Sequence, residues 1–164
     1  MKASKKSVQG SLKDYLEKRD FTLTSEPSGK QETVNDSNCT MDKIFVIQEH
    51  HSSRLHYDFR LEKDGVLKSW AVPKGFPETP ADKRLAVETE DHPIEYAKFE
   101  GTIPAGQYGA GKVIIWDKGT YEEKIWNKKM IEFVLSGKRL KAQYVLVPLK
   151  KAGEKNWLLL KTKE

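Results

Sequence analysis

The stretch EHHSSRLHYDFR, from Glu49 to Arg60, contains three of the four histidines of this 164-residue chain. Imidazole is a good ligand for Zn, Fe, Ni and Cu, and a neighbouring carboxylate also admits Mn. Side chains of a β-strand alternate between its two faces, so LHYDFRL places His56, Asp58 and Arg60 opposite an apolar set. Two histidines with Asp58 would leave coordination positions open for water and substrate, and Arg60 adds a donor fork that matches phosphate. We therefore expect a metal site on a strand, the alternative being an exposed polar strand face without a ligand.

The fourth histidine, His92, lies between Asp91 and Pro93. Pro93 restricts the backbone there, and Asp91 could orient the imidazole, as carboxylates behind a metal site do. Tyr96 follows four residues later, where one helical turn would bring it to the same side. The alternative is an ordinary capped turn with no role in chemistry.

Elements that would position these residues can be read from residue 43 onward, where short apolar runs alternate with turn signals. We expect strands in KIFVIQ, LHYDFRLEK, VLKSWAV, RLAVET, KVIIWD, TYEEKI, IEFVLS, LKAQYVLVPL and NWLLLKT. Asp64-Gly65 predicts a hairpin turn, and Gly119, Gly137 and Gly153 are expected to separate later strands. The fold class predicted is mainly β, a compact antiparallel barrel with short helices, one of them in HPIEYAKF.

The N-terminal part is expected to differ from this domain. Residues 1–18 form a leader that is flexible or a short helix, residues 19–164 form a single domain, and residues 24–42 form a polar loop. Cys39 is the only cysteine, which fits a reducing interior. No signal peptide or apolar span is visible, so we expect a cytoplasmic protein without a membrane partner.

The charge distribution favours an anionic partner, although acids and bases are both plentiful. The chain carries a net charge of +5, and residues 138–164 alone carry +6 from eight Lys/Arg and two Glu. A solvated surface explains this equally well. The glycine-rich segment GQYGAGKV resembles the start of a P-loop, but Val113 replaces the required Ser/Thr and a strand follows. Its glycines are therefore interpreted as turn residues.

Three blocks of the sequence closely resemble the 3′-phosphoesterase module of bacterial DNA ligase D. They are FVIQEHHSSRLHYDFRLEKDGVLKSWAVPKG, RLAVETEDHPIEYAKFEGTIPAGQYGAGKVIIWDKGTYE and GKRLKAQYVLV. The resemblance runs from about Arg19 to about Leu160, and the HHxxRLHYDFRLE and EDHPxEY motifs are highly specific. It implies a compact β-barrel with a crescent groove, here expected as a stand-alone module.

The resemblance also implies an activity. The family removes a 3′-terminal ribonucleotide from DNA by a phosphodiesterase step, then removes the 3′-phosphate by a phosphomonoesterase step, leaving a 3′-OH. The implied metal is Mn2+, or another divalent ion such as Co2+ or Zn2+, on His50, His56 and Asp58; His51 is not a ligand. The implied catalytic residues are Arg60, His92, Tyr96, Glu26, Asp20 and Arg19. Lys74, Arg84 and Gln48, with Arg60 and His92, would contact the phosphate or nucleic acid, and Glu90 and Asp91 would lie in or just behind the site.

Partners implied are primer–template DNA 3′ ends with a terminal ribonucleotide or a 3′-phosphate, and a separate ligase, polymerase or Ku-like protein. The protein itself is expected to be a monomer. Two other functions stay open at this point. A basic DNA-end-binding module without catalysis would recruit a ligase, and the HYD segment also matches half of an Fe(II) oxygenase facial triad, with His92 as the distal ligand.

Overall fold

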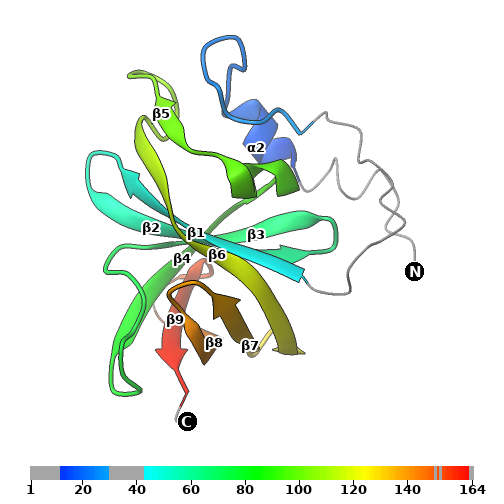
Figure 1. Cartoon of the computed structure of the whole chain (residues 1–164), viewed down its shortest axis with the longest axis vertical. Coiled ribbons are helices and arrows are strands. Elements are labelled where there is room, and N and C mark those ends of the chain that lie inside the picture. The colour runs from blue at the N-terminus through cyan, green and yellow to red at the C-terminus, as the bar shows by residue number, and fades with distance from the viewer. Residues whose placement is uncertain (1–11, 30–42, 150, 152, 163–164) are drawn as a thin grey trace.

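The computed structural model of the chain describes residues 12–29, 43–149, 151 and 153–162 (Figure 1). The elements are α2 (Lys13–Glu17), β1 (Lys43–His51), β2 (Leu55–Lys63), β3 (Val66–Val72), β4 (Lys83–His92), the 3-10 helix η1 (Ile94–Lys98), β5 (Gly101–Ile103), β6 (Gly111–Trp126), β7 (Ile131–Gly137), β8 (Lys141–Pro148) and β9 (Asn156–Lys161). Expectations for residues 1–11 and for residues 30–42 with Cys39 lie outside the described residues.

All strand pairs are antiparallel, and the sheet closes on itself. The order β1-β2-β3-β4-β9-β8-β7-β6 returns to β1 through a β1–β6 pairing, so eight strands form a barrel and β5 extends β6 on its other edge. The prediction of an antiparallel β-barrel is therefore confirmed. No helix among the described residues has the length and apolar character needed to cross a bilayer.

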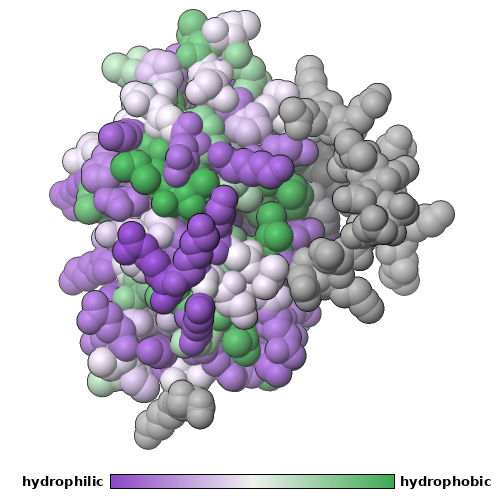
Figure 2. Space-filling view, viewed as in Figure 1, coloured by the Kyte–Doolittle hydropathy of each residue, from purple (hydrophilic) through white to green (hydrophobic). Residues whose placement is uncertain are grey.

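Two clusters of apolar side chains hold this structure together. The larger cluster fills the barrel, around Phe59, Phe133 and Leu146. The smaller cluster lies outside the barrel wall, where Tyr15 of α2 and Tyr96 of η1 pack against Leu67. Figure 2 shows hydrophobic side chains on one face of this outer layer, over the part of β6 nearest β5 and beside η1, with hydrophilic side chains around them. The outer layer matters for function because it covers one wall of the barrel.

The short helix expected before residue 18 is confirmed as α2, and it is part of the folded structure. Tyr15 is fully buried, and its ring lies edge-on to that of His92 with the centroids 5.0 Å apart. The hydroxyl of Tyr15 also donates a hydrogen bond to the backbone carbonyl of Pro27. The packed part of the chain thus begins before the boundary expected at residue 19.

Turn predictions were right at Asp64-Gly65 and wrong at Gly119. Asp64 and Gly65 both have positive φ, 54° and 83°, and join β2 to β3. Gly119 lies inside β6, which runs without a break where two strands were expected. A Cβ at Gly119 would lie 2.2 Å from the backbone oxygen of Ser136, so glycine is required there by close strand contact.

Candidate active site

The polar face of β2 is buried, in contrast to a simple exposed strand face. Asp58 is 9% exposed and Arg60 is 3% exposed. The segment after α2, the 3-10 helix η1 and the loop after β5 line the cavity on this side of the barrel wall, through Arg19, Tyr96 and Tyr108 respectively. On the opposite face, Phe59 and Leu61 point into the barrel core as expected, whereas Leu55 is exposed. A buried charged side chain is unfavourable without partners, so each of these charges must be paired or hydrogen-bonded.

His50, His56 and Asp58 come together at one end of the β1–β2 hairpin. His50 and His56 are direct neighbours in the antiparallel register, and Asp58 lies on the same face of β2 as His56. Potential ligand atoms of the three residues all lie within 4.8 Å of one another. His51, the other histidine of the pair, is exposed and faces Glu49 instead. The expected ligand set is therefore assembled by the fold.

Hydrogen bonds to each histidine test whether this set suits a metal ion. His50 Nε2 lies 2.6 Å from the carbonyl oxygen of Gly109, and His56 Nδ1 lies 3.1 Å from that of Arg54. Each ring thus donates one N–H to a backbone carbonyl, a common arrangement behind metal-bound histidines. The other nitrogens face Asp58, at 3.1 Å from His50 Nδ1 and 3.2 Å from His56 Nε2. Lone pairs that face a carboxylate need protons or a cation between them, so the donor set fits a metal.

The charge state of Asp58 agrees with this arrangement. Burial alone would raise the pKa of the Asp58 carboxyl, but hydrogen bonds with His50 and His56 and the charge of Arg60 hold that pKa well below its usual range. Burial also opposes a charge on His56, but the hydrogen bond and the charge of Asp58 outweigh it and raise the pKa of the imidazole. Asp58 is thus anionic at neutral pH, as a metal ligand must be.

Arg60 is held beside this set by neutral partners. Its Nε donates to Gln48 Oε1 at 2.7 Å and its Nη1 donates to Ser69 Oγ at 2.9 Å, while Nη2 lies 3.6 Å from Asp58 Oδ2. Gln48 is itself fully buried, and its amide donates to the backbone carbonyls of Tyr96 and Phe99. Gln48 therefore positions Arg60, and among the described residues Asp58 is the one carboxylate that forms an ion pair with the guanidinium.

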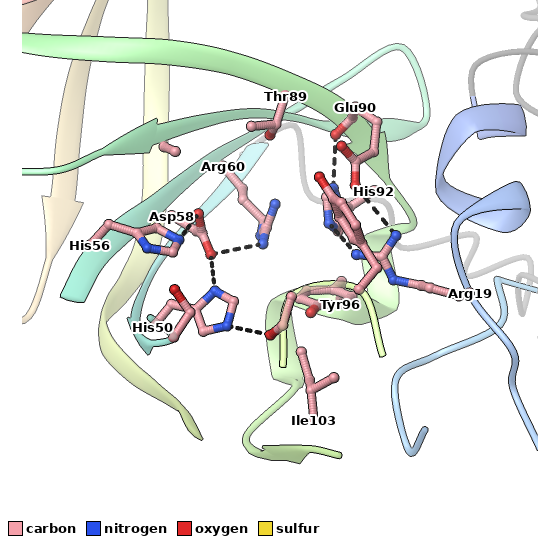
Figure 3. A pocket seen from close by; sticks show the side chains of 14 residues that line it. Arg19, His50, His56, Asp58, Arg60, Thr89, Glu90, His92, Tyr96 and Ile103 are labelled. Carbon is pink, nitrogen blue, oxygen red and sulfur yellow. Dashed lines mark hydrogen bonds and ion pairs between the residues drawn. The ribbon is translucent and has the colours of Figure 1, made fainter. Parts of the chain in front are cut away.

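A second group lines the other side of the cavity and consists of Arg19, Glu90, His92 and Tyr96 (Figure 3). Glu26 does not line the cavity but is hydrogen-bonded to two members of this group. Arg19 donates to Glu26 at 2.8 Å and to Glu90 at 3.3 Å, and Tyr96 donates its hydroxyl proton to Glu26 at 2.7 Å. Arg19 Nη2 also lies 3.3 Å from His92 Nε2. Figure 3 shows Arg60 between this group and the two-histidine set. The loop around KRDFTLTSEP thus contributes two residues that composition alone gave no reason to select.

His92 is neutral in this surrounding. Its Nδ1 lies 2.8 Å from the carbonyl oxygen of Glu90, to which it donates, so Nε2 accepts from Arg19. Complete burial and the positive charges of Arg60 and Arg19 lower the pKa of His92 well below its usual value. A β-bulge helps to place the residue: Leu67 of β3 pairs with His92 and Ser69 pairs with Thr89, which leaves one extra residue in β4.

A cavity of about 300 Å³ lies between the two groups, and all members of both groups line it. Two further lining residues, Tyr108 and Gly109, come from the turn-forming GQYGAGKV segment. Gly109 has a φ of 76°, and its carbonyl is the partner of His50. Sequence reasoning correctly took these glycines as turn residues but missed their place in the site; the positive-φ requirement of a tight turn was the available signal.

Six expected site residues do not line this cavity. Two of them, Gln48 and Glu26, hold Arg60 and Arg19 by hydrogen bonds, and the other four are Asp20, Asp91, Lys74 and Arg84. Asp20 is exposed and accepts hydrogen bonds from Thr22. Asp91, which was expected to orient the His92 ring, pairs with Lys68 at 2.8 Å, and the backbone carbonyl of Glu90 accepts the hydrogen bond from His92 Nδ1 instead. Lys74 lies after β3 beside a different pocket, and Arg84 is in the part of β4 that pairs with β9. The Fe(II) triad that required His92 is not assembled, because His50 completes the set and His92 faces Arg19.

This geometry defines a class: a closed antiparallel β-barrel whose outer wall carries a candidate two-histidine, one-carboxylate metal centre beside a fixed arginine. Residues 48–148 match the family model described as the DNA Ligase D 3′-phosphoesterase domain. The chain belongs to this family.

Relatives that match the chain include multifunctional non-homologous end joining proteins LigD from two organisms. Identity is 46% over 159 residues for Pseudomonas aeruginosa, covering 93% of this chain and 19% of that protein. For Mycolicibacterium smegmatis it is 47% over 168 residues, covering 96% and 21%. The multifunctional non-homologous end joining DNA repair protein LigD from Mycobacterium tuberculosis H37Rv is 51% identical over 144 residues, covering 85% of this chain and 18% of that protein. The chain spans about a fifth of the length of these relatives.

Proposed function

We propose that this protein is a divalent-metal-dependent phosphoesterase that heals DNA 3′ ends. It removes a 3′-terminal ribonucleotide as a phosphodiesterase and then removes the remaining 3′-phosphate as a phosphomonoesterase, which leaves a 3′-OH. The observation that carries this proposal is that the His50–His56–Asp58 set and Arg60 line one cavity. Arg60 is fixed there by hydrogen bonds to the neutral side chains of Gln48 and Ser69. Membership of the family supports the same reaction class.

His50, His56 and Asp58 would hold the metal, with Mn2+ as the expected ion and Co2+ or Zn2+ as alternatives. A divalent ion bound there would polarise a phosphate oxygen and lower the pKa of a bound water. The chain's own contribution is rigid placement of the three ligands, since the backbone carbonyls of Gly109 and Arg54 fix both imidazole rings.

Arg60 would bind the phosphate and stabilise charge that develops on its oxygens. Its value for this role comes from its partners, because Gln48 and Ser69 fix the guanidinium without neutralising it. Arg19 differs, since Glu26 and Glu90 both contact it and offset its charge. We assign Arg19 to orienting His92, and Glu26 to fixing Arg19 and the Tyr96 hydroxyl.

His92 would act as a proton acceptor or as a neutral hydrogen-bonding group. Its Nδ1–H is held by the Glu90 carbonyl and the lone pair of its Nε2 accepts from Arg19, so it has no proton to give to a leaving oxygen in this state. Protonating the leaving group would require His92 to gain a proton first, against its lowered pKa.

The substrates we propose are primer–template 3′ ends, and the products would serve a ligase or polymerase. The relatives are named as non-homologous end joining proteins, so a separate ligase, polymerase or Ku-like protein is the partner class proposed for this chain.

Ligand variants and a matched control test this function. Primer–templates that end in one ribonucleotide or in a 3′-phosphate would be incubated with Mn2+ and with His56→Ala, Asp58→Ala or His51→Ala. We expect the first two to lose both activities and His51→Ala to retain them, because His51 is exposed and outside the set. Activity in the ligand variants would refute the assignment. Ribonucleotide-end binding without turnover by the wild type would favour the non-catalytic module.

A further inference from the structure

A second pocket, of about 450 Å³, opens beside the barrel core; we call it the barrel-mouth pocket. Its aromatic wall consists of Tyr57 and Trp116, and its basic residues are Lys74, Arg139 and Lys161. Tyr57 and Trp116 are partly buried against the core cluster, and parts of both remain accessible. Apart from Lys74, for which the family resemblance implies a contact with phosphate or nucleic acid, no residue of this pocket has a part in the proposed chemistry.

The aromatic wall presents an ordered flat surface. The rings of Tyr57 and Trp116 meet edge to face with centroids 5.7 Å apart, and the Arg139 guanidinium lies 4.9 Å from the Trp116 centroid. A β-bulge places Trp116: Ile47 of β1 pairs with Asp117, but Gln48 pairs with Ile115, so Trp116 is the extra residue. The bulge therefore sets the direction of this side chain.

Asp117 fixes the turn that carries Arg139. It is 3% exposed, and its carboxylate accepts backbone N–H bonds from the consecutive residues Lys138, Arg139 and Leu140, as well as from Lys118. Gly137 allows this approach, because a Cβ there would lie 2.4 Å from Asp117 Oδ2. The turn thus fixes Arg139 over Trp116 before any ligand binds. This favours binding, because less side-chain conformational entropy is lost when the ligand makes contact.

Charge in the pocket favours an anionic ligand. The pocket is lined by three cationic side chains, Lys74, Arg139 and Lys161, and by one carboxylate, that of Glu78. Across the described part of the chain none of the three cations forms an ion pair. Cations that follow a groove together with exposed aromatic rings are the features that bind single-stranded nucleic acid, through phosphates and stacked bases respectively. An acidic peptide would use the cations but would gain little from the flat aromatic wall.

The pocket is close to the candidate active site. His56 of the metal set and Tyr57 are consecutive on β2 and point to opposite faces, with adjacent Cα atoms about 3.8 Å apart. On β3, Ala71 lines the active-site cavity, and Lys74, three residues later, lines the barrel-mouth pocket. A nucleic-acid strand that crosses this rim could contact both.

We infer that the barrel-mouth pocket binds an unpaired nucleotide segment of the DNA substrate, with a base stacked on Trp116 and phosphates on Arg139 and Lys74. This inference rests on the proposed function for its choice of DNA. It adds a subsite that holds single-stranded DNA next to the position of the reacting end.

Binding measured without turnover tests the inference. Fluorescence anisotropy of a labelled ten-residue oligo-dT would be followed in chelator for the wild type, Trp116→Leu, Trp116→Tyr, Arg139→Gln and Lys138→Gln. We expect Trp116→Leu to weaken binding on the order of tenfold and Trp116→Tyr to restore most of it, because one stacked base contributes about that much. Arg139→Gln should reduce the slope of log affinity against log salt by about 0.7, whereas Lys138→Gln, one residue away and outside the pocket, should not.

Equal losses in Arg139→Gln and Lys138→Gln, or unchanged binding in a folded Trp116→Leu, would overturn the inference. Full competition by a poly-glutamate peptide would also overturn it and would indicate an acidic protein ligand. Asp58→Ala separates the two proposals. If this variant loses phosphoesterase activity and binds oligo-dT normally, both stand; if it keeps its activity while Trp116→Leu still weakens binding, only the proposed chemistry fails.

Discussion

Replacing Gln48 by Leu should destabilise the protein strongly, because one buried amide connects Arg60 to the backbone of η1. The substitution removes the Arg60 Nε bond at 2.7 Å and the bonds to the carbonyls of Tyr96 and Phe99 at 2.8 and 3.1 Å. A hydrogen bond to a charged group contributes about 1.5–3 kcal/mol and a neutral one about 1 kcal/mol. The expected loss is about 3–5 kcal/mol, a large share of the ~5–15 kcal/mol typical of a domain.

Urea unfolding in chelator measures this loss as a change in midpoint at constant slope. Gln143→Leu is the matched control, since Gln143 is only partly buried and donates to Glu132 on the neighbouring strand; we expect a cost below about 1 kcal/mol. Ser69→Ala should fall between the two, because it removes one partner of Arg60. If Gln48→Leu and Gln143→Leu had equal effects, the amide would not hold Arg60 as described.

Three more predictions follow from the site and the barrel. Asp58→Asn should abolish the rise in melting temperature that saturating Mn2+ gives the wild type, about 5–10 °C at 100 times Kd, as scanning calorimetry would show; an equal rise in the variant would place the metal elsewhere. Because the folded-state pKa of His92 is lowered, the unfolded chain binds a proton below pH 6.5 that the folded chain does not, so the unfolding free energy should fall by up to about 1.4 kcal/mol per pH unit from pH 6.5 to 5. His92→Asn should flatten that slope, and an unchanged slope would contradict the burial of a neutral His92. His56 does not affect this test, because its pKa is raised and it therefore changes the pH dependence of the unfolding free energy only above pH 6.5. Asp117→Asn should cost about 2–4 kcal/mol in chemical denaturation, since a buried carboxylate accepts four backbone N–H groups there, and a loss below 1 kcal/mol would contradict that role.

Strand alternation predicted the barrel and the shared face of His56, Asp58 and Arg60, because both follow from local geometry. It could not predict that this face is buried, since the covering segments, α2 and the KRDFTLTSEP loop, are distant in sequence and show little periodicity. The family resemblance supplied Arg19 and Glu26, and the fold brings them to Tyr96 and Glu90.

Features that depend on β-bulges and on tertiary contacts could not be predicted from the sequence. A regular strand would not bring both Thr89 and Glu90 to the cavity, and the β4 bulge that does so has no clear sequence signature. The turn predicted at Gly119 was wrong for a similar reason. A glycine required for close contact between strands cannot be distinguished in the sequence from a glycine required for a turn.

We propose that the His50–His56–Asp58 set supports hydrolysis at DNA 3′ ends. The most direct measurement is a gel time course with a 5′-labelled primer–template ending in one ribonucleotide, in Mn2+ and in chelator. We expect the labelled strand to shorten to a 3′-phosphate end and then to gain a 3′-OH, in that order and only with metal. Substrate that stays intact with Mn2+, Co2+ and Zn2+, although the protein binds it, would contradict the claim.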